Sequence, residues 1–298
     1  MDFTIHEIPA HLLLKIGDYF YKRGQIQNAV ATYRIALSVQ PGMAEAVSRI
    51  GIAQKGPIGL VANELQCFLE EKYPGLHVFV GEGLATWNRT TGFAKDKRFC
   101  ELAEQHESLL PLVNWHWHLN TVVWALRSTQ HVDGDLVELG VFKGHTTSFV
   151  AAYLDFGSWK KKWFLYDTFA GIPEEQLNTG WETVNETTYD GTYSYEEVRD
   201  RFAKYENIEV IRGRVPEILS EQCPEKISFL HLDLNSAIAE IAALEIVFDR
   251  IQPGGVIVFD DFGWPSAKEQ YAAETQWTKE RGYDILELPT GQGLLIKK

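Results

Sequence analysis

The sequence predicts an α/β fold: a doubly wound, mostly parallel, seven-stranded Rossmann-like sheet that ends in a C-terminal antiparallel hairpin and is preceded by an α-helical module. From residue 131 onward, short apolar runs of strand length alternate with segments of helical spacing, which is typical of a parallel sheet covered on both faces. Acidic residues and glycines gather directly after these runs, at the edge where such sheets bind their ligands.

The predicted elements follow in chain order. Strands are expected at residues 136–139, 163–166, 208–211, 227–232 and 255–259, and the terminal hairpin at 283–288 and 294–297. Helices are expected at 144–154, 238–250 and 265–281. The chain then divides into a helical module at 1–56, a helical linker or cap at 57–130 and the sheet domain at 131–298.

The composition is that of an ordinary globular protein, with 45% hydrophobic and 23% charged residues and a net charge of −13. Because the chain is acidic and carries no prominent run of lysine and arginine, a nucleic-acid partner is disfavoured. No apolar stretch reaches bilayer length and no signal-peptide pattern is found, which predicts no membrane association. The widely spaced Cys67, Cys100 and Cys223 indicate reduced thiols and a cytoplasmic location.

The N-terminal module resembles a tetratricopeptide repeat, in which small and aromatic residues recur at fixed offsets. The matching positions are Gly17, Phe20, Gly24, Ala29, Tyr33, Ala36 and Pro41. Gly51 lies one period of about 34 residues after Gly17, and a helix-stopping cluster follows at residues 56–59. The pattern predicts a helical hairpin that either packs on the neighbouring domain or offers a groove for a protein partner or self-association.

Within the linker, helices are expected at 63–72, 99–110 and 114–127, with a short strand at 76–80. The run Trp115-His116-Trp117-His118 could hold a metal ion. Histidines two apart face different sides of a helix, however, whereas metal-binding pairs are three or four apart. We therefore expect this aromatic segment to pack on the sheet domain.

The loop after the first predicted strand carries Glu138, Gly140 and Gly144. Gly140 permits a tight turn, and Gly144 lets the backbone approach a ligand at the start of a helix. Phe142 and Lys143 occupy positions where dinucleotide-binding loops favour small residues, which disfavours a dinucleotide-dependent oxidoreductase. An acid at 138 suits a ligand with an ammonium or sulfonium group.

Carboxylates follow three further predicted strands. Asp167 follows the second strand, where it could accept both hydroxyls of a ribose or cap a helix. Asp233 follows the fourth strand, and Asp260 and Asp261 follow the fifth. Because gathered carboxylates repel one another, they favour a site for Mg²⁺, Mn²⁺ or Ca²⁺, although an Asp pair can also be a capping device.

Together these segments resemble the macrocin/mycinamicin O-methyltransferase family of class I methyltransferases. The matching stretches are VELGVFKG (137–144), LYDTFAGIP (165–173), IRGRV (211–215), LHLD (230–233) and PGGVIVFDDFG (253–263). The resemblance does not cover the N-terminal module. It implies methyl transfer from S-adenosylmethionine to a hydroxyl of a small-molecule acceptor, often a sugar of a natural product, assisted by Mg²⁺ or another divalent cation.

The resemblance also implies individual roles. The implied cofactor residues are Glu138, Gly140, Phe142, Gly144, Thr146, Asp167, Gly213, Arg214 and Asp233, with the ribose on Asp167 and the adenine near Gly213 and Arg214. The implied metal ligands are Asp233, Asp260 and Asp261.

The chain departs from the family pattern at Asn235, where a second Asp would serve as general base. An amide cannot take the proton. Either metal coordination acidifies the acceptor hydroxyl by itself, or His231 or His145 acts as base, and Asn235 binds the acceptor or the metal instead.

A polar insertion at residues 174–201 carries Trp181, Tyr189, Tyr193 and Tyr195. It is either a lid over the acceptor or a variable surface loop. Two alternative functions stay open: methylation of another acceptor, such as an amine, without metal, and a catalytically silent methyltransferase fold that binds a partner.

Overall fold

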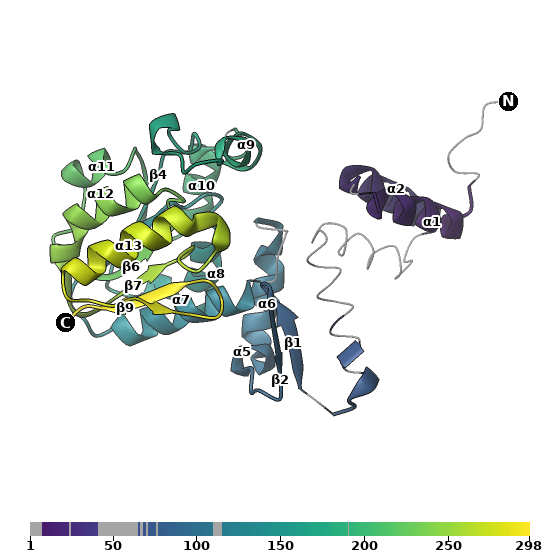
Figure 1. Ribbon diagram of the computed structural model, residues 1–298, viewed down its shortest axis with the longest axis horizontal. Coiled ribbons are helices and arrows are strands. Elements are labelled where there is room, and N and C mark those ends of the chain that lie inside the picture. Colours follow the sequence, from purple (N-terminus) through teal and green to yellow (C-terminus); the bar gives the residue numbers. More distant parts are fainter. Residues whose placement is uncertain are drawn as a thin grey trace. The chain divides into compact units, whose positions relative to one another are not determined.

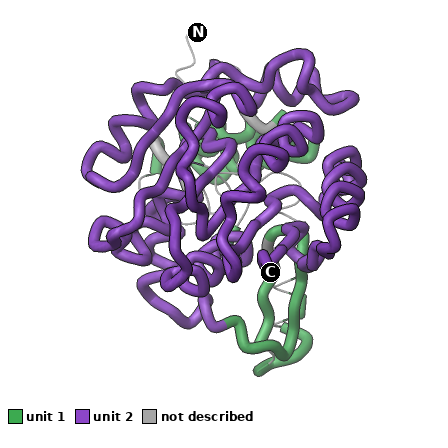
Figure 2. The backbone as a smooth tube through the Cα atoms, turned by 90° about the vertical axis from the view of Figure 1, so that its left-hand side faces the viewer, with its two compact units in different colours: residues 1–91, 110–115 green, residues 92–109, 116–298 purple. Residues whose placement is uncertain are grey.

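The structure is a computed structural model in which residues 8–23, 25–40, 65, 68–69, 71–75, 77–109, 115–189 and 191–298 are described (Figure 1). It divides into two compact units, residues 1–91 with 110–115 and residues 92–109 with 116–298 (Figure 2). The second half-repeat expected from Gly51, the stop at 56–59, the domain boundary at 56/57 and Cys67 lie outside the described residues.

The smaller unit contains a helical hairpin of α1 (Ala10–Tyr21) and α2 (Ile26–Val39). The two helices approach closely where Gly17 faces Tyr33, because a Cβ added at Gly17 would lie 2.2 Å from the Tyr33 ring. The Tyr33 hydroxyl donates a hydrogen bond to Asp18 Oδ1 at 2.8 Å. The helical module is thus present, and its assignment to the tetratricopeptide repeats stays a prediction.

A short antiparallel hairpin completes the described part of this unit. Its strands are β1 (Val78–Gly81) and β2 (Leu84–Trp87), joined by a tight turn at Glu82 and Gly83. The strand expected at 76–80 is found, whereas its partner β2 was not predicted.

The larger unit is built on a seven-stranded sheet with the order β5-β4-β3-β6-β7-β9-β8. The strands are β3 (Asp135–Leu139), β4 (Trp163–Asp167), β5 (Ile208–Arg212), β6 (Ile227–Leu232), β7 (Ile251–Phe259), β8 (Leu286–Glu287) and β9 (Gly293–Ile296). The first five pair in parallel, and β9 pairs antiparallel to both β7 and β8. This confirms the predicted fold class, including the terminal hairpin.

Helices cover both faces of this sheet (Figure 1). They are α5 (Gly92–Lys95), α6 (Lys97–His106), α7 (His116–Thr129), α8 (His145–Tyr153), α9 (Glu182–Val184), α10 (Tyr195–Phe202), α11 (Glu217–Glu221), α12 (Ala237–Val247) and α13 (Lys268–Glu280), with short 3₁₀ turns between them and a π turn, η5 (Asn185–Tyr189). Helices α11, α12 and α13 pack together on one face, and α7, α8 and α10 lie on the other. No helix in the described part of the chain is long and apolar enough to cross a membrane.

The sequence placed the start of the sheet domain at residue 131, but the compact unit includes α5, α6 and α7 as well. Aromatic contacts hold these helices to the sheet domain: the ring of Phe99 lies 4.8 Å from that of Phe149 on α8, and His116 packs edge-on against Phe93 and Phe99. The packing expected for the His116–His118 region is therefore found, because α7 contacts β6 and β7 and the ring of His118 lies near that of Trp264. Of the predicted cap, residues 92–109 and 116–130 belong to the same compact unit as the sheet, and the rest belongs to the smaller unit.

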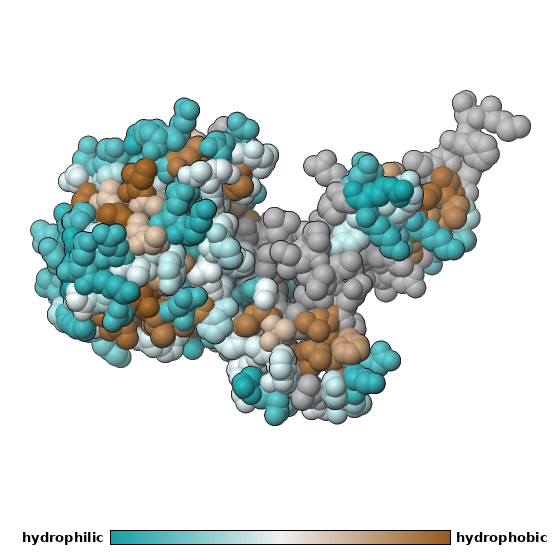
Figure 3. All heavy atoms as spheres, viewed as in Figure 1, coloured by the Kyte–Doolittle hydropathy of each residue, from teal (hydrophilic) through white to brown (hydrophobic). Residues whose placement is uncertain are grey.

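One hydrophobic core of the larger unit lies between the sheet and α11–α13, and α7 and α8 bury further apolar side chains on the other face. All six residues of β6 are buried, four of them apolar, and its two polar residues, Ser228 and His231, are hydrogen-bonded within the fold. Helix α13 buries Gln270, Glu274, Trp277 and Thr278, which share one face, and exposes its lysines. Much of the visible face of this unit is accordingly hydrophilic (Figure 3).

Candidate active site

Three strand ends converge at Gly140, directly after β3. Its N–H donates to the carbonyl of Tyr166 at 2.9 Å, and the N–H of Asp233 donates to the carbonyl of Leu139 at 2.8 Å. Gly140 has φ +86°, and an added Cβ would lie 1.8 Å from the carbonyl oxygen of Asp233. A glycine is therefore required for the β3 loop to approach the β6 loop as closely as it does.

The carboxylate of Asp167 ties these loops together. Its Oδ2 accepts hydrogen bonds from the N–H groups of Val141 (2.8 Å) and Phe142 (2.9 Å). Its Oδ1 accepts from the N–H of Phe169 (2.7 Å) and from the hydroxyl of Tyr193 (3.0 Å). Asp167 thus lies at the predicted cofactor edge, bound to loop amides and to the insertion rather than to a helix terminus.

Glu138 is buried and faces inward from β3. Its Oε1 lies 3.3 Å from Nδ1 of His231 on β6, and its Oε2 accepts a hydrogen bond from the hydroxyl of Thr147 on α8. The structure therefore connects Glu138 to the centre of the site through His231. Thr147 is a residue that the sequence did not single out.

The ligand atoms of His231, Asp233 and Asp260 all lie within 4.8 Å of one another. His231 Nε2 lies 3.2 Å from Asp260 Oδ1, which also accepts from the amide of Gln292 at 2.9 Å. The amide of Asn235 donates to Asp233 Oδ1 at 3.0 Å. Among the described residues, the structure thus gathers two of the three predicted metal ligands with a histidine that had been considered as a base.

Burial, followed by repulsion between neighbouring carboxylates, shapes the electrostatics of this cluster. Burial raises the pKa of Asp233 well above its ordinary value, and Asp260 and Asp261 raise it further. Burial and Asp260 likewise raise the pKa of Asp261. Burial alone would raise the pKa of Asp260, but the hydrogen bond from His231 and the nearby His118 hold it below its ordinary value.

His231 forms the positive centre of the cluster. Although burial opposes its charge, hydrogen bonds to Asp260 and Glu138 raise its pKa well above the ordinary value. Both ring nitrogens are engaged with carboxylates, so His231 holds Glu138 and Asp260 together in this arrangement. It fits a positioning role better than that of a free base.

His145, the other predicted base, begins helix α8 and is buried. Burial, followed by the nearby His106, lowers its pKa to about 4. The imidazole is therefore neutral at neutral pH, and its low pKa makes it a weak proton acceptor.

His145 is expected to make the protein sensitive to acid. Its folded-state pKa of about 4 lies below the ordinary 6.5, so the unfolded state takes up the proton first as pH falls. Stability is unaffected above about pH 7 and is lost between about pH 6.5 and 4, by up to about 3 kcal/mol. Denaturant unfolding measures this: between pH 7 and pH 4.5, the free energy of unfolding should fall more in the wild type than in His145→Gln. Equal losses in both proteins would contradict this assignment.

The remaining predicted cofactor residues line the same edge. Phe142 has φ +49° on the loop after β3, and Gly144 has φ +73° at the start of α8, where Thr146 is partly exposed. The N–H of Gly213 donates to the carbonyl of Asp167 at 3.0 Å. Arg214 forms ion pairs with Glu175 and Glu217.

A buried polar network that the sequence did not reveal supports the loop after β6. Glu240 on α12 accepts hydrogen bonds from the N–H of Leu234 (3.0 Å) and from the amide of Gln270 on α13 (3.1 Å). Burial raises the pKa of Glu274 well above its ordinary value, and the charge of Glu240 raises it further. Asn178 joins this network to the insertion by donating to the carbonyl of Asn235 at 3.1 Å.

The insertion folds against the cofactor loop. The rings of Tyr189 and Tyr193 both pack edge-on against Phe142, with centroids 5.4 and 4.8 Å away. The side chain of Asn185 bonds both the N–H and the carbonyl of Ile172, and the indole of Trp181 donates to Ser266. This contact with the predicted site favours the lid over the surface loop.

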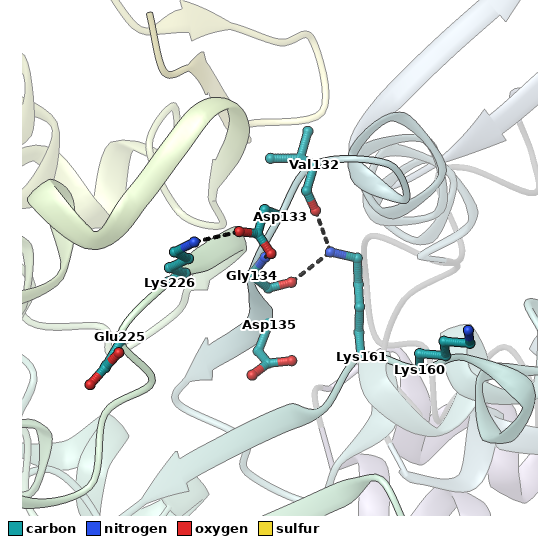
Figure 4. Close-up of a pocket in the computed structure, with 8 residues that line it drawn as sticks. All are labelled: Val132, Asp133, Gly134, Asp135, Lys160, Lys161, Glu225 and Lys226. Carbon is teal, nitrogen blue, oxygen red and sulfur yellow. Dashed lines mark hydrogen bonds and ion pairs between the residues drawn. The ribbon is translucent and has the colours of Figure 1, made fainter.

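A second hollow, of about 450 Å³, lies at the opposite edge of the sheet, where β3, β4 and β6 begin (Figure 4). It is lined by Val132, Asp133, Gly134, Asp135, Lys160, Lys161, Glu225 and Lys226. The ammonium of Lys161 donates to the carbonyls of Val132 and Gly134, and Lys226 pairs with Asp133 at 2.6 Å. Because Lys161, Lys226 and Asp133 find their partners within the protein, we assign them a role in holding the strands together.

The sheet order, the glycine loop after β3 and the acidic strand ends define a methyltransferase of Rossmann-like fold. The chain belongs to the macrocin-O-methyltransferase (TylF) family, whose model matches residues 117–283. This confirms the family resemblance found in the sequence.

Individual relatives agree with this family. The chain is 25% identical over 147 residues to the 8-demethyl-8-(2,3-dimethoxy-alpha-L-rhamnosyl)-tetracenomycin-C 4'-O-methyltransferase of Streptomyces olivaceus, a match that covers 46% of this chain and 56% of that protein. The chain thus spans about half the length of that curated relative. The solved structure of the O-methyltransferase NovP is similar in fold, with a TM-score of 0.52 and 19% identity over 61% of this chain and 79% of that chain.

Proposed function

We propose that this protein transfers a methyl group from S-adenosylmethionine to a hydroxyl of a small molecule of the sugar-bearing natural-product type, with the assistance of a divalent cation. Membership of the macrocin-O-methyltransferase family supports the reaction class. The Streptomyces relative is named for methylation of the 4' position of a rhamnosyl group, which supports a sugar hydroxyl as the acceptor.

The observation that carries the proposal is the double role of the segment at Asp233. Its backbone packs on the cofactor loop, because its N–H bonds to Leu139 and its carbonyl touches Gly140. Its side chain belongs to the cluster with His231 and Asp260. One residue therefore borders both the methyl donor and the acceptor, and fixed proximity of two reactants accounts for much of the acceleration in such a transfer.

The cluster fits a divalent cation. Burial raises the pKa values of Asp233 and Asp261, and repulsion from neighbouring carboxylates raises them further; a bound cation would relieve that repulsion. Asp233 and Asp260, with His231 beside them, would hold the ion, and carboxylate oxygens suit Mg²⁺ or Mn²⁺. Among the described residues, Asp261, the third predicted ligand, is not part of this gathered set. When bound, the ion would polarise the acceptor hydroxyl and lower its pKa as a Lewis acid.

In this proposal Asn235 orients Asp233 and does not deprotonate the acceptor hydroxyl. Its amide donates to Asp233 Oδ1, and its backbone has φ +55° and is held by Asn178. This keeps one oxygen of Asp233 directed away from Asn235 and available to the cluster. The aromatic rings of the insertion would stack on a sugar, as amphipathic aromatics do.

Calorimetric titration of the full chain with S-adenosylhomocysteine, with and without Mg²⁺, tests the cofactor assignment. We expect binding in the micromolar range and its loss in Asp167→Ala, because that variant removes the anchor of the cofactor loop. A folded wild-type protein that takes up no S-adenosylhomocysteine would overturn the proposal and favour the silent fold.

Transfer of labelled methyl from S-adenosylmethionine to a rhamnosylated tetracenomycin then tests the acceptor and the cation together. Methylation that stops with excess chelator and returns with Mg²⁺ is the expected result. Turnover unchanged by chelator would exclude cation assistance and favour the metal-independent alternative, in which the Asp cluster is structural.

A further inference from the structure

We propose that Tyr193 competes with the cofactor's ribose for Asp167, so that cofactor binding displaces the segment carrying Tyr193 from the site. The inference rests on the proposed function, because it takes S-adenosylmethionine as the ligand. It adds a residue of the insertion that sets cofactor affinity and links the lid to the cofactor loop.

The first argument is the occupancy of the Asp167 carboxylate. An ionised carboxylate offers about four lone-pair positions. In the structure all of these are used: two on Oδ2 by Val141 and Phe142, and two on Oδ1 by Phe169 and Tyr193. A ribose hydroxyl can bind Asp167 only by replacing one of these four donors.

The second argument identifies which donor leaves. Three of them are backbone N–H groups at the ends of β3 and β4, and they cannot withdraw without undoing the loops at Gly140 and Phe169. The fourth is the hydroxyl of a side chain 26 positions along the chain. A phenol and a ribose hydroxyl are both neutral O–H donors, so one can take the place of the other.

The phenol is kept in its donor form. Burial raises the pKa of Tyr193, and the charge of Asp167 raises it further, so the hydroxyl stays protonated across the physiological range. The contact is therefore a hydrogen bond to an ionised carboxylate, which is stronger than one between neutral groups. The cofactor has to break it.

The third argument is that the segment is anchored at both ends, outside the stretch that carries Tyr193. Asn185 is bonded to both backbone groups of Ile172, and Ser194 and Glu197 form a capping box at the start of α10. Between these anchors, the described residues contact the site through the ring edges of Tyr189 and Tyr193 on Phe142 and Phe169 and through the hydrogen bond to Asp167. The π turn η5 lies in this stretch, and such turns are frequent at functional sites.

Calorimetry of Tyr193→Phe with S-adenosylhomocysteine tests the inference. Removing the competing hydroxyl should tighten binding about fivefold, the factor expected for one net hydrogen bond. Tyr195→Phe is the matched control, because Tyr195 also packs on Phe169 but its hydroxyl points to the carbonyl of Val210. Its affinity should equal that of the wild type, and thermal melting should show both variants folded.

The 2',3'-dideoxy analogue of S-adenosylhomocysteine provides the second arm, since it has no hydroxyl to place on Asp167. We expect it to bind the wild type and Tyr193→Phe equally. Unchanged or weakened S-adenosylhomocysteine binding in Tyr193→Phe, or an equal gain for the dideoxy analogue, would overturn the competition while leaving the proposed function intact. No S-adenosylhomocysteine binding by any variant would overturn the proposed function and this inference together.

Discussion

Replacing Gly140 with alanine is expected to abolish S-adenosylhomocysteine binding and to destabilise the larger unit by more than about 4 kcal/mol. The added Cβ would lie 1.8 Å from the carbonyl oxygen of Asp233, and the backbone at φ +86° is unfavourable for alanine. Because the obstructing atom is backbone, relief requires the β3 and β6 loops to separate. That movement would disperse Glu138, His231 and Asp233.

Thermal unfolding and calorimetric titration measure this effect. For a unit of this size, such a loss corresponds to a fall of roughly 10 °C in melting temperature. Gly282→Ala is the control, because Gly282 also has a positive φ, +75°, but an added Cβ meets no described atom within 4 Å. It should cost only about 1–2 kcal/mol and leave ligand binding unchanged. If both variants lose a similar, small free energy of unfolding, the close approach of the β3 and β6 loops is not required for stability.

Replacing Asp260 with asparagine is expected to lower methyl-transfer turnover about 10³-fold, the scale of several kcal/mol of Lewis-acid stabilisation. The change keeps the shape of the side chain and an oxygen for Gln292 but removes the charge that pairs with His231. Affinity for S-adenosylhomocysteine should be nearly unchanged, because Asp260 follows β7, whereas most of the predicted cofactor residues follow β3 and β4.

Mn²⁺ binding followed by electron paramagnetic resonance gives a readout that does not depend on the acceptor. The wild type should bind Mn²⁺, and Asp260→Asn should bind it roughly 100-fold more weakly, within the range of losses when a metal site is disturbed. Asp249→Asn, which changes an exposed carboxylate elsewhere in the larger unit, serves as control. Equal Mn²⁺ affinity in all three proteins would show that the cluster of Asp233 and Asp260 does not bind the metal ion.

Much of the larger unit could be predicted from its sequence because its signals are local. The buried strands are mainly apolar segments of strand length, and β6 is found at the predicted residues, 227–232. Strand β7 begins at Ile251, four residues before its predicted start, because the Pro253-Gly254-Gly255 segment lies within the strand opposite a register shift in β6. Helix α10 was missed although Ser194 and Glu197 have the spacing of a capping box.

The site was predictable only in part, and the missing residues share a cause. Gln292 reaches Asp260 from the turn of the terminal hairpin, and Thr147 reaches Glu138 from a helix. Glu240 and Glu274 lie one on each of two packed helices. Each of these side chains is an ordinary polar residue in its own segment, so no spacing along the chain identifies its partner.

By itself, the sequence determined the fold class, the edge of the sheet where the site lies and the carboxylates placed there. The carboxyl ends of parallel strands lie along one edge of the sheet, so Asp167, Asp233 and Asp260 all had to lie along that edge. Only the tertiary structure decided that His231 joins two carboxylates, and that a tyrosine of the insertion supplies the fourth hydrogen bond to Asp167. Those arrangements depend on the distances between segments that are far apart in the chain. Tertiary packing sets these distances, and the local sequence pattern does not.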